Sequence, residues 1–251
     1  MVKKSGKRSK TEANKPLAGK KKVMSLREKL EAKLHGGQFR SLNEDLYRNT
    51  GAANFARFCR EPELMEAYHR GFREQAKKWP RNPVDEVIGL LSKRERLVVA
   101  DMGCGDAKIF EKCGQKHEVH SFDLVATKKC IVACDVAKTP LKNGTVDFVV
   151  FCLALMGPSL WDFLKEAHRI LKTGGHLHIT EVRSRFDEQH DGLNAFERSL
   201  KALGFDKHKP TDATSNTMFA TFHYKKTARP IDLKALDSIN FSFKVCLYKK
   251  R

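Results

Sequence analysis

The segment that decides the fold of this chain is Ala100-Asp101-Met102-Gly103-Cys104-Gly105-Asp106. It follows the apolar run from Leu97 to Ala100, which is typical of a strand buried in a parallel sheet. Two glycines then permit a tight turn, and residues 106–113 have helical character. A strand, a glycine turn and a helix start together predict an elbow where backbone amides approach a nucleotide-like ligand closely.

The residues around this turn favour a cationic ligand over a dinucleotide. The dinucleotide fingerprint has a third glycine at position 108, where this chain has Lys108. An acid in the first helical turn, Asp106, would repel a pyrophosphate, but it suits a ligand that carries an amine and a sulfonium. The sequence therefore predicts S-adenosylmethionine as the cofactor.

Further acids follow in the order that such a pocket requires. Asp123 ends the apolar segment 119–124, 20 residues after Gly103, where an acid accepts hydrogen bonds from both ribose hydroxyls. Asp135 and Val136 end the segment 131–136, placed to receive the adenine amino group and to lie beside the ring. Each acid taken singly is equally typical of a strand-end turn, and it is the ordered series that favours a cofactor pocket.

A fourth apolar segment, residues 146–153, predicts a strand whose end lies near the acceptor. Ligands of open α/β sheets lie beyond the carboxyl ends of the strands, so we expect Cys152 beside the cofactor and residues 153–157 along the acceptor pocket. The segment lacks the Asn/Asp-Pro-Pro-Tyr/Phe pattern used for exocyclic amines. A nucleophilic Cys152, as in cytosine C5 methylation, is an alternative, although the usual Pro-Cys setting is absent.

The rest of the core alternates strands and helices, which predicts a doubly wound α/β sheet. Helices are expected at 161–172 and 193–203, a strand at 176–182, and an antiparallel pair near 205–210 and 217–225. Only residues 125–130 separate the second and third strands, too few for a crossover helix. The third strand is therefore expected to be vestigial or to have lost its helix.

Ahead of the core, residues 25–93 have a helical pattern. Ser25 and Glu28 form a capping box, and the pair Gly36-Gly37 predicts the end of that first helix. The other helices are expected at 40–48, from Pro62 to about Trp79 with Leu64, Tyr68, Phe72 and Ala76 on one face, and at 84–93.

Charge and cysteine content indicate the partner and the compartment. The net charge of +18, from 48 basic and 30 acidic residues, favours a polyanion, because bound phosphates release their counterions. Residues 1–23 hold nine Lys/Arg and one acid, which predicts a solvated arm that is either a nuclear address, an RNA-binding tail or a plain solubilising end. No apolar run is long enough for a membrane span, and seven cysteines without a CxxC pair predict reduced thiols and no metal site.

Several long stretches resemble the ribosomal RNA-processing protein 8 family, also called nucleomethylin. They are Phe39 to Tyr47, Tyr68 to Gln75, Trp79 to Val84, residues 100–106, Phe151 to Gly157, Glu181 to Phe186 and Cys246 to Arg251. The resemblance covers about residues 25–251. It implies a Rossmann-like class I methyltransferase sheet with an N-terminal helical layer. The organisation expected from it is a basic arm 1–23, a helical region 24–94 that packs on the core, a methyltransferase domain 95–230 and a C-terminal extension 231–251.

The resemblance also implies a substrate, a location and a set of cofactor contacts. Fungal and animal members of the family are nucleolar and methylate N1 of an adenine in large-subunit ribosomal RNA, so ribosomal RNA or a pre-ribosomal particle is the expected partner, in the nucleus and nucleolus. Carried over residue by residue, the cofactor contacts are His69, Gly103, Asp123, Asp135, Val136 and Cys152. Only the resemblance selects His69, as a lid from the helical layer over the cofactor.

No single catalytic residue is expected, because adenine N1 has a free lone pair and needs no base. Asp106, Asp135 and Glu181 are candidates for stabilising the cationic product, and Arg183 and Arg185 are candidate phosphate contacts. Two other functions stay open. One is a cofactor-binding adaptor in a chromatin-silencing complex, and the other is a small-molecule methyltransferase, which residues 166–175 resemble.

Overall fold

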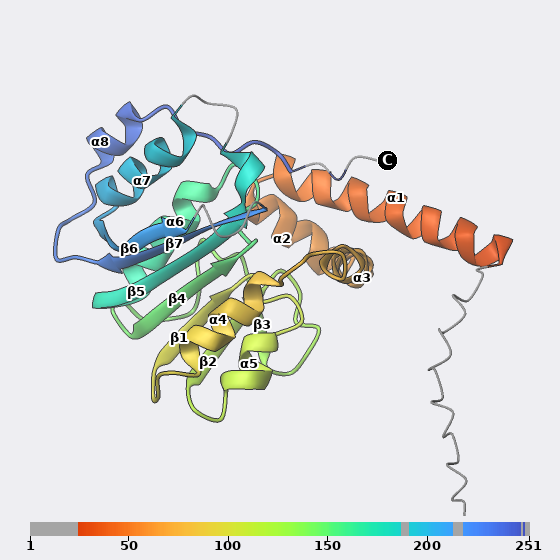
Figure 1. The fold of residues 1–251 in the computed structure, drawn as a ribbon, viewed down its shortest axis with the longest axis horizontal. Coiled ribbons are helices and arrows are strands. Elements are labelled where there is room, and N and C mark those ends of the chain that lie inside the picture. The colour runs from red at the N-terminus through yellow and green to blue at the C-terminus, as the bar shows by residue number, and fades with distance from the viewer. Residues whose placement is uncertain (1–24, 187–190, 213–217, 247, 249–251) are drawn as a thin grey trace, which may run out of the picture.

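Seven strands form one sheet in the computed structural model, which describes residues 25–186, 191–212, 218–246 and 248 (Figure 1). The strands are β1 (Val98–Met102), β2 (Glu118–Asp123), β3 (Ile131–Ala133), β4 (Val146–Cys152), β5 (Leu171–Val182), β6 (Phe205–Asp212) and β7 (Phe219–Lys226). Their order is β3-β2-β1-β4-β5-β7-β6, with β7 antiparallel to both of its neighbours and the other pairs parallel. The predicted doubly wound sheet with an antiparallel edge is confirmed.

The short link between β2 and β3 has a simple explanation in the structure. β3 has three residues and pairs in parallel with the end of β2, from Ser121↔Ile131 to Asp123↔Ala133. The connection, residues 124–130, contains turns and bends and no helix. The third strand is thus vestigial, and its crossover helix is missing.

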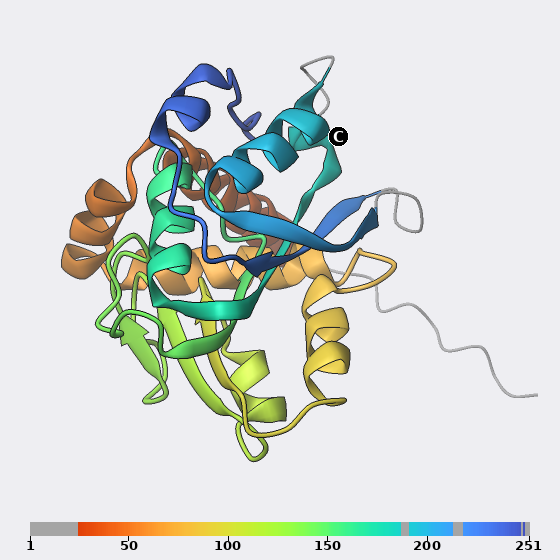
Figure 2. The same ribbon diagram turned by 90° about the vertical axis from the view of Figure 1, so that its left-hand side faces the viewer.

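Helices cover both faces of the sheet, as Figures 1 and 2 show. One face packs against α4 (Pro83–Leu91) and α5 (Lys108–Cys113), through a cluster that includes Val87, Leu91, Ile109, Val99 and Val150. The other face packs against α6 (Leu160–Ile170), α7 (Gly192–Ala202) and α8 (Leu233–Ser238) in the largest apolar cluster. Strands buried on both faces explain why the sequence of β1 and β4 is almost continuously apolar.

Three helices form a separate layer beyond the carboxyl ends of the strands: α1 (Leu26–Arg48), α2 (Gly51–Arg60) and α3 (Glu63–Ala76). We call α1–α3 the helical layer. Its own apolar cluster contains Phe39, Leu42, Leu46, Phe58, Met65 and Tyr68. Close contact between α1 and α3 depends on Gly71, since a Cβ there would come within 2.4 Å of the Phe39 Cβ.

The prediction that Gly36-Gly37 ends the first helix is wrong. The capping box of Ser25 and Glu28 is present, but α1 continues through both glycines to Arg48. The reason is tertiary packing, because residues after the glycines, such as Phe39 and Leu42, are buried against α3 and hold the helix together. The half before the glycines projects from the body, and its leucines, Leu26, Leu30 and Leu34, are exposed (Figure 1).

Helix α2 was not among the predicted elements. It is short, and the side chain of Thr50 caps it by accepting a hydrogen bond from the Ala53 amide. Its buried residues, Gly51, Asn54 and Phe58, lie on one face, but ten residues give only a short helical pattern. The basic arm predicted at 1–23 lies outside the described residues.

After α8 the chain returns to the helical layer. The Lys244 amide donates to the Arg185 carbonyl, and the Asn43 side-chain amide of α1 donates to the Cys246 carbonyl at 2.8 Å. The Tyr248 ring lies 5.1 Å from the Phe39 ring. The residues described after α8, 239–246 and 248, thus join the sheet side of the molecule to α1, and we call them the C-terminal segment.

Candidate functional site

The glycine elbow between β1 and α5 forms the floor of the site. Gly103 has φ +78° and Gly105 has φ +55°, conformations that L side chains rarely adopt. A Cβ on Gly103 would lie 2.6 Å from the Ala154 Cβ, whereas a Cβ on Gly105 would meet no atom within 4 Å. Glycine is therefore required at 103 by both conformation and packing, and the backbone at 105 faces open space where a ligand can approach.

Asp123 organises the elbow from the end of β2. One carboxylate oxygen accepts the Gly105 amide at 2.7 Å, and the other accepts the Leu124 amide at 2.7 Å. The residue is 8% exposed and lines the pocket. Because each carboxylate oxygen has a second lone pair, these bonds orient Asp123 and still leave acceptors for hydroxyl groups of a ligand.

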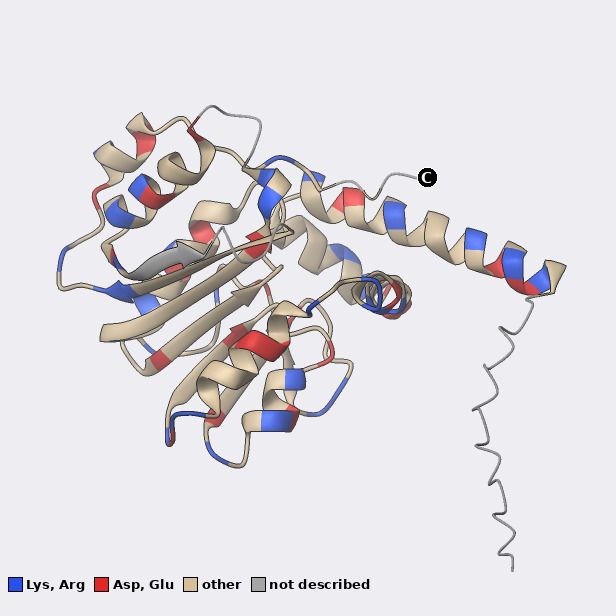
Figure 3. Ribbon diagram, viewed as in Figure 1, with Lys and Arg blue, Asp and Glu red and all other residues tan. Residues whose placement is uncertain are grey.

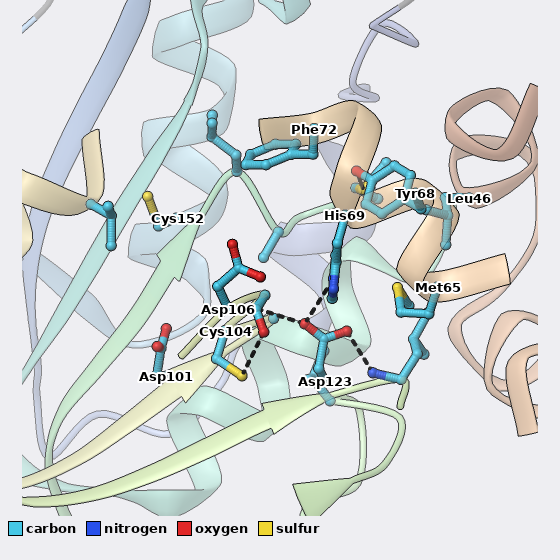
Figure 4. A pocket seen from close by; sticks show the side chains of 18 of the residues that line it. Leu46, Met65, Tyr68, His69, Phe72, Asp101, Cys104, Asp106, Asp123 and Cys152 are labelled. Carbon is cyan, nitrogen blue, oxygen red and sulfur yellow. Dashed lines mark hydrogen bonds and ion pairs between the residues drawn. The ribbon is translucent and has the colours of Figure 1, made fainter. Parts of the chain in front are cut away.

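His69 reaches the same carboxylate from above, from helix α3 (Figure 4). Its Nε2 lies 3.9 Å from Asp123 Oδ2, and its Nδ1 is buried without a hydrogen-bond partner among the described residues. The residue is 6% exposed. The structure therefore places this residue, which the family resemblance selected, over the end of β2 where a lid is expected.

Asp135 and Val136 lie on the third side of the pocket, after β3. The Asp135 carboxylate accepts the Ala137 amide at 3.0 Å, and a Cβ on Gly51 would come within 2.5 Å of Asp135 Oδ1. The first residue of α2 therefore lies directly against this carboxylate, and a side chain there would have to displace it. Asp135, Val136, Gly51 and Asn54 all line the pocket.

Burial favours the neutral forms of two groups at the ends of β1 and β4. Desolvation raises the pKa of the Asp101 carboxyl to about 7, and the nearby Asp123 charge adds to the rise. Burial also raises the pKa of the Cys152 thiol well above its usual value, with Asp101 again contributing. A thiol that resists ionisation is a poor nucleophile, which argues against covalent catalysis by Cys152.

Asp106 has a partner that the sequence did not reveal. Its Oδ1 accepts a hydrogen bond from Arg73 Nη1 at 2.9 Å, and its backbone carbonyl accepts one from Lys128 Nζ at 2.6 Å. Arg73 also contacts Glu66 on α3. The Arg73–Asp106 ion pair thus links the helical layer to the first turn after the elbow at the wall of the pocket.

The loop after β4 closes the remaining side. Leu153, Ala154 and Met156 line the pocket, and the Tyr68 hydroxyl lies 3.6 Å from the Met156 sulfur. Leu153 has φ +59°, unusual for a branched side chain, and its amide donates to the Thr180 carbonyl. We call residues 153–157 the acceptor loop, since they occupy the position predicted to line the acceptor pocket.

The prediction that Arg185 contacts phosphate is wrong. Its side chain is 1% exposed and forms an ion pair with Glu181, which is equally buried. The Glu181 carboxylate is therefore already paired with Arg185 inside the protein, and it is not free to stabilise a cationic product. Arg183 is partly exposed just outside this pair.

The pocket enclosed by these elements has a volume of about 450 Å³. It collects all the predicted cofactor contacts, His69, Gly103, Asp123, Asp135, Val136 and Cys152. Sequence reasoning missed other lining residues from the helical layer and α4: Leu46, Gly51, Asn54, Met65, Tyr68, Phe72, Arg73, Ala76, Lys77, Asn82 and Val84. The sequence predicts Tyr68, Phe72 and Ala76 on one face of a helix, but helical spacing does not determine which part of the molecule that face contacts.

Beyond the pocket, charge is spread over the surface. Figure 3 shows lysines and arginines along α1 and α3 and around α5, with acids between them. Within the part of the chain that the structure describes, no group of His, Cys, Asp and Glu side chains is arranged to hold a metal ion. In the same part, no helix combines the length and the apolar composition of a membrane span.

Comparison with known proteins gives a consistent result. A family model described as a hypothetical methyltransferase matches residues 25–251. The chain is 41% identical over 252 residues to the Schizosaccharomyces pombe protein named 25S rRNA (adenine(645)-N(1))-methyltransferase, covering 96% of this chain and 77% of that protein. It is also 41% identical to the Arabidopsis thaliana protein named ribosomal RNA-processing protein 8, covering 88% of this chain and 77% of the relative.

Other relatives are longer, and the solved structures are more distant. The Caenorhabditis briggsae ribosomal RNA-processing protein 8 is 42% identical, and this chain spans 64% of its length. Among solved structures, a Burkholderia thailandensis 1,6-didemethyltoxoflavin-N1-methyltransferase matches with a TM-score of 0.50 and 18% identity, covering 66% of this chain and 86% of that one. That similarity shows the fold, a class I methyltransferase sheet.

Proposed function

The chain belongs to the ribosomal RNA-processing protein 8 family of methyltransferases, and we propose that it methylates N1 of an adenine in large-subunit ribosomal RNA with S-adenosylmethionine as donor. The observation that carries this proposal is the likeness, over nearly the whole chain, to a relative named for that reaction. The pocket supports it with the acids and glycines that the donor requires.

The donor set of the pocket fits this cofactor. Gly103 and Gly105 provide an open backbone cradle for a ligand. Asp123 would hold the ribose hydroxyls, Asp135 the adenine amino group, and His69 would cover them from α3. When bound, S-adenosylmethionine supplies a methyl group attached to a positively charged sulfur.

The protein's own residues then have to expose and aim the adenine. In the transfer, a bond forms between N1 and the methyl carbon while the sulfur–carbon bond breaks and sulfur keeps the electron pair. The N1 lone pair is free in the neutral base, so no side chain must first remove a proton. Because N1 is hidden in a duplex, the base has to be unpaired or flipped, and Tyr68, Phe72 and Met156 offer an apolar wall that excludes water.

Charge supports a polyanionic substrate and a nucleolar location. The net charge of +18 favours RNA over a small neutral molecule, and the arm 1–23 with its nine Lys/Arg extends that charge. We infer that the enzyme acts in the nucleus and nucleolus on ribosomal RNA or on a pre-ribosomal particle. The family membership supports this location, since ribosome biogenesis begins there.

The direct test is nucleoside mass spectrometry of ribosomal RNA from cells that lack the protein. We expect 1-methyladenosine to be lost from the large-subunit RNA, and to return when the wild-type chain, but not the Asp123→Ala variant, is restored. Persistence of 1-methyladenosine in the deleted cells would contradict the proposed function.

The arm can be tested separately by deleting residues 1–23. We expect weaker RNA binding with a smaller salt dependence, because fewer phosphates are neutralised, while the affinity for S-adenosylhomocysteine stays unchanged. Fluorescence imaging of the truncated chain measures its nucleolar retention. If the location and the salt dependence of RNA binding are both unchanged, the arm serves only to keep the protein soluble.

A further inference from the structure

Both polar backbone atoms of one residue in the acceptor loop are held by a buried ion pair. The Leu155 amide donates to Glu181 Oε1 at 2.9 Å, and the Leu155 carbonyl accepts from Arg185 Nη2 at 2.7 Å. Glu181 Oε2 and Arg185 Nη1 are 2.6 Å apart, and both side chains are 1% exposed. We call this arrangement of Glu181 and Arg185 the clamp.

Arg185 is itself fixed from three sides. Its guanidinium lies 4.8 Å from the centre of the Tyr47 ring of α1 and 4.1 Å from the centre of the Phe243 ring of the C-terminal segment. Its Nε donates to the Lys244 carbonyl at 3.2 Å. The clamp therefore transmits the positions of α1 and of the C-terminal segment to the acceptor loop.

The clamped residue lies next to the parts of the loop that face the ligand. Ala154, directly before Leu155, packs on Gly103 of the elbow, and Met156, directly after it, lines the pocket and contacts Tyr68. In the described part of the chain, the Leu155 amide and carbonyl form hydrogen bonds only with the clamp. A shift of Leu155 would displace both neighbours, and so change where the acceptor base can lie relative to the elbow.

Stability alone does not account for such a pair. Burying two charges carries a large desolvation penalty, and an apolar pair of similar size is commonly as stable or more so. A guanidinium fork and a carboxylate, however, fix direction as well as distance. We propose that Glu181 and Arg185 are positioning residues for methyl transfer, which set the acceptor loop so that the base is aimed at the donor. This role rests on the proposed function, and it is exerted through Leu155 and not by contact with the substrate.

The test compares three variants of the full chain: Glu181→Gln, Arg185→Lys and the double variant Glu181→Leu/Arg185→Met. The double variant removes the clamp without leaving one buried charge unpaired, so it keeps the fold where a single apolar substitution would fail. The control is Asp147→Asn, which breaks the Lys172–Asp147 ion pair and weakens a bond to the Val98 amide at the other ends of the strands.

Each variant is assayed for S-adenosylhomocysteine binding by calorimetry, for methylation of unmodified large-subunit RNA, and for amide exchange. For the double variant we expect kcat to fall at least about tenfold, with KM for RNA changing less and cofactor affinity staying within about threefold. Exchange of the Leu155 amide should accelerate about tenfold or more. The kcat of Arg185→Lys should lie between those of the wild type and the double variant, because lysine keeps the charge but lacks the guanidinium fork. Asp147→Asn should have the wild-type kcat.

Two results would overturn the proposal. One is a folded double variant in which either kcat or exchange of the Leu155 amide stays at the wild-type value. The other is a loss of cofactor affinity as large as the loss of kcat, which would make the clamp a purely structural element. A wild-type protein that binds the cofactor but leaves the RNA unmethylated would contradict the proposed function, and with it the kinetic role, whereas unchanged exchange contradicts the clamp by itself.

Discussion

The floor and the cover of the pocket are built in different ways. The floor consists of the elbow after β1 and the acids after β2 and β3, all at the ends of adjacent parallel strands. The cover consists of α1–α3 and the acceptor loop, brought together by side-chain packing and by the clamp. The floor presents backbone and carboxylate groups to the pocket, while the cover presents an apolar and aromatic surface.

This difference explains why single changes should act differently in the two regions. A substitution in the floor removes direct ligand contacts and should affect cofactor affinity first. A substitution in the cover moves helices or a loop and should affect stability or turnover first. Substitutions in each region therefore test that division.

The largest effect is expected for Asp123→Ala. The variant loses the acceptors for the ribose hydroxyls and the bonds that orient Gly105 and Leu124. Hydrogen bonds to a charged group contribute about 1.5–3 kcal/mol each, so two of them correspond to a roughly hundredfold or greater loss of cofactor affinity. Calorimetry with S-adenosylhomocysteine measures it, and near-normal binding would mean that the floor is assigned wrongly.

The next effect is expected for Gly103→Ala. The added Cβ meets Ala154 at 2.6 Å in a backbone with φ +78°, so the elbow and the acceptor loop must separate. Gly174→Ala is the matched control, since Gly174 has φ +82° but no atom lies within 4 Å of the added Cβ.

Both variants should lose about 1–3 kcal/mol of unfolding free energy through strain, but only Gly103→Ala should also weaken cofactor binding. Urea unfolding and calorimetry separate the two contributions. Equal cofactor affinity in the two variants would show that the contact between elbow and loop is unimportant.

A second pair of variants compares the cover with α4. Gly71→Ala places a Cβ 2.4 Å from the Phe39 Cβ, between α3 and α1, and should destabilise the protein by about 1–3 kcal/mol. Gly89→Ala, in α4 with no atom within 4 Å, should stabilise it by about 0.5–1 kcal/mol through the better helix propensity of alanine. Thermal unfolding measures both, and the same sign for the two would contradict the close packing of the helical layer.

The pH dependence of stability is expected to involve neither region. Burial lowers the pKa of His178 to about 3 and those of His168 and His176 to about 4. These side chains lie on α6 and β5, away from the pocket lining. Above pH about 6.5 they are neutral in both folded and unfolded chains, so their contribution to stability is fully present.

As the pH falls from about 6.5 towards 4, the unfolded chain takes up protons that the folded protein cannot, and stability is lost. Urea unfolding across this range should give a falling free energy of unfolding, and His178→Phe should have a shallower slope. A variant slope as steep as that of the wild type would mean that other groups dominate the acid sensitivity.

Much of the floor was predictable because its signals are local in sequence. The apolar runs, the glycines and the spacing from Gly103 to Asp123 and Asp135 follow from the repeating strand–turn pattern, and strand ends of a parallel sheet meet at one edge. The cover was less predictable. The glycines at 36 and 37 predict a helix end, yet α1 continues through them because Phe39 and Leu42 pack in the helical layer. Helix α2 has only ten residues, so its pattern is short.

Sequence by itself determined the sheet, the order of the cofactor acids and the charge that suits RNA, because each depends on residue type and spacing along the chain. Tertiary structure alone decided that Arg185 is buried in the clamp and not exposed to phosphate, that Arg73 pairs with Asp106, and that Gly51 lies against Asp135. Arg73 and Asp106, Gly51 and Asp135, and Arg185 and its Leu155 carbonyl partner are all distant in the chain. No local pattern encodes them, since a charged side chain has the same appearance in sequence whether it meets solvent or a buried partner.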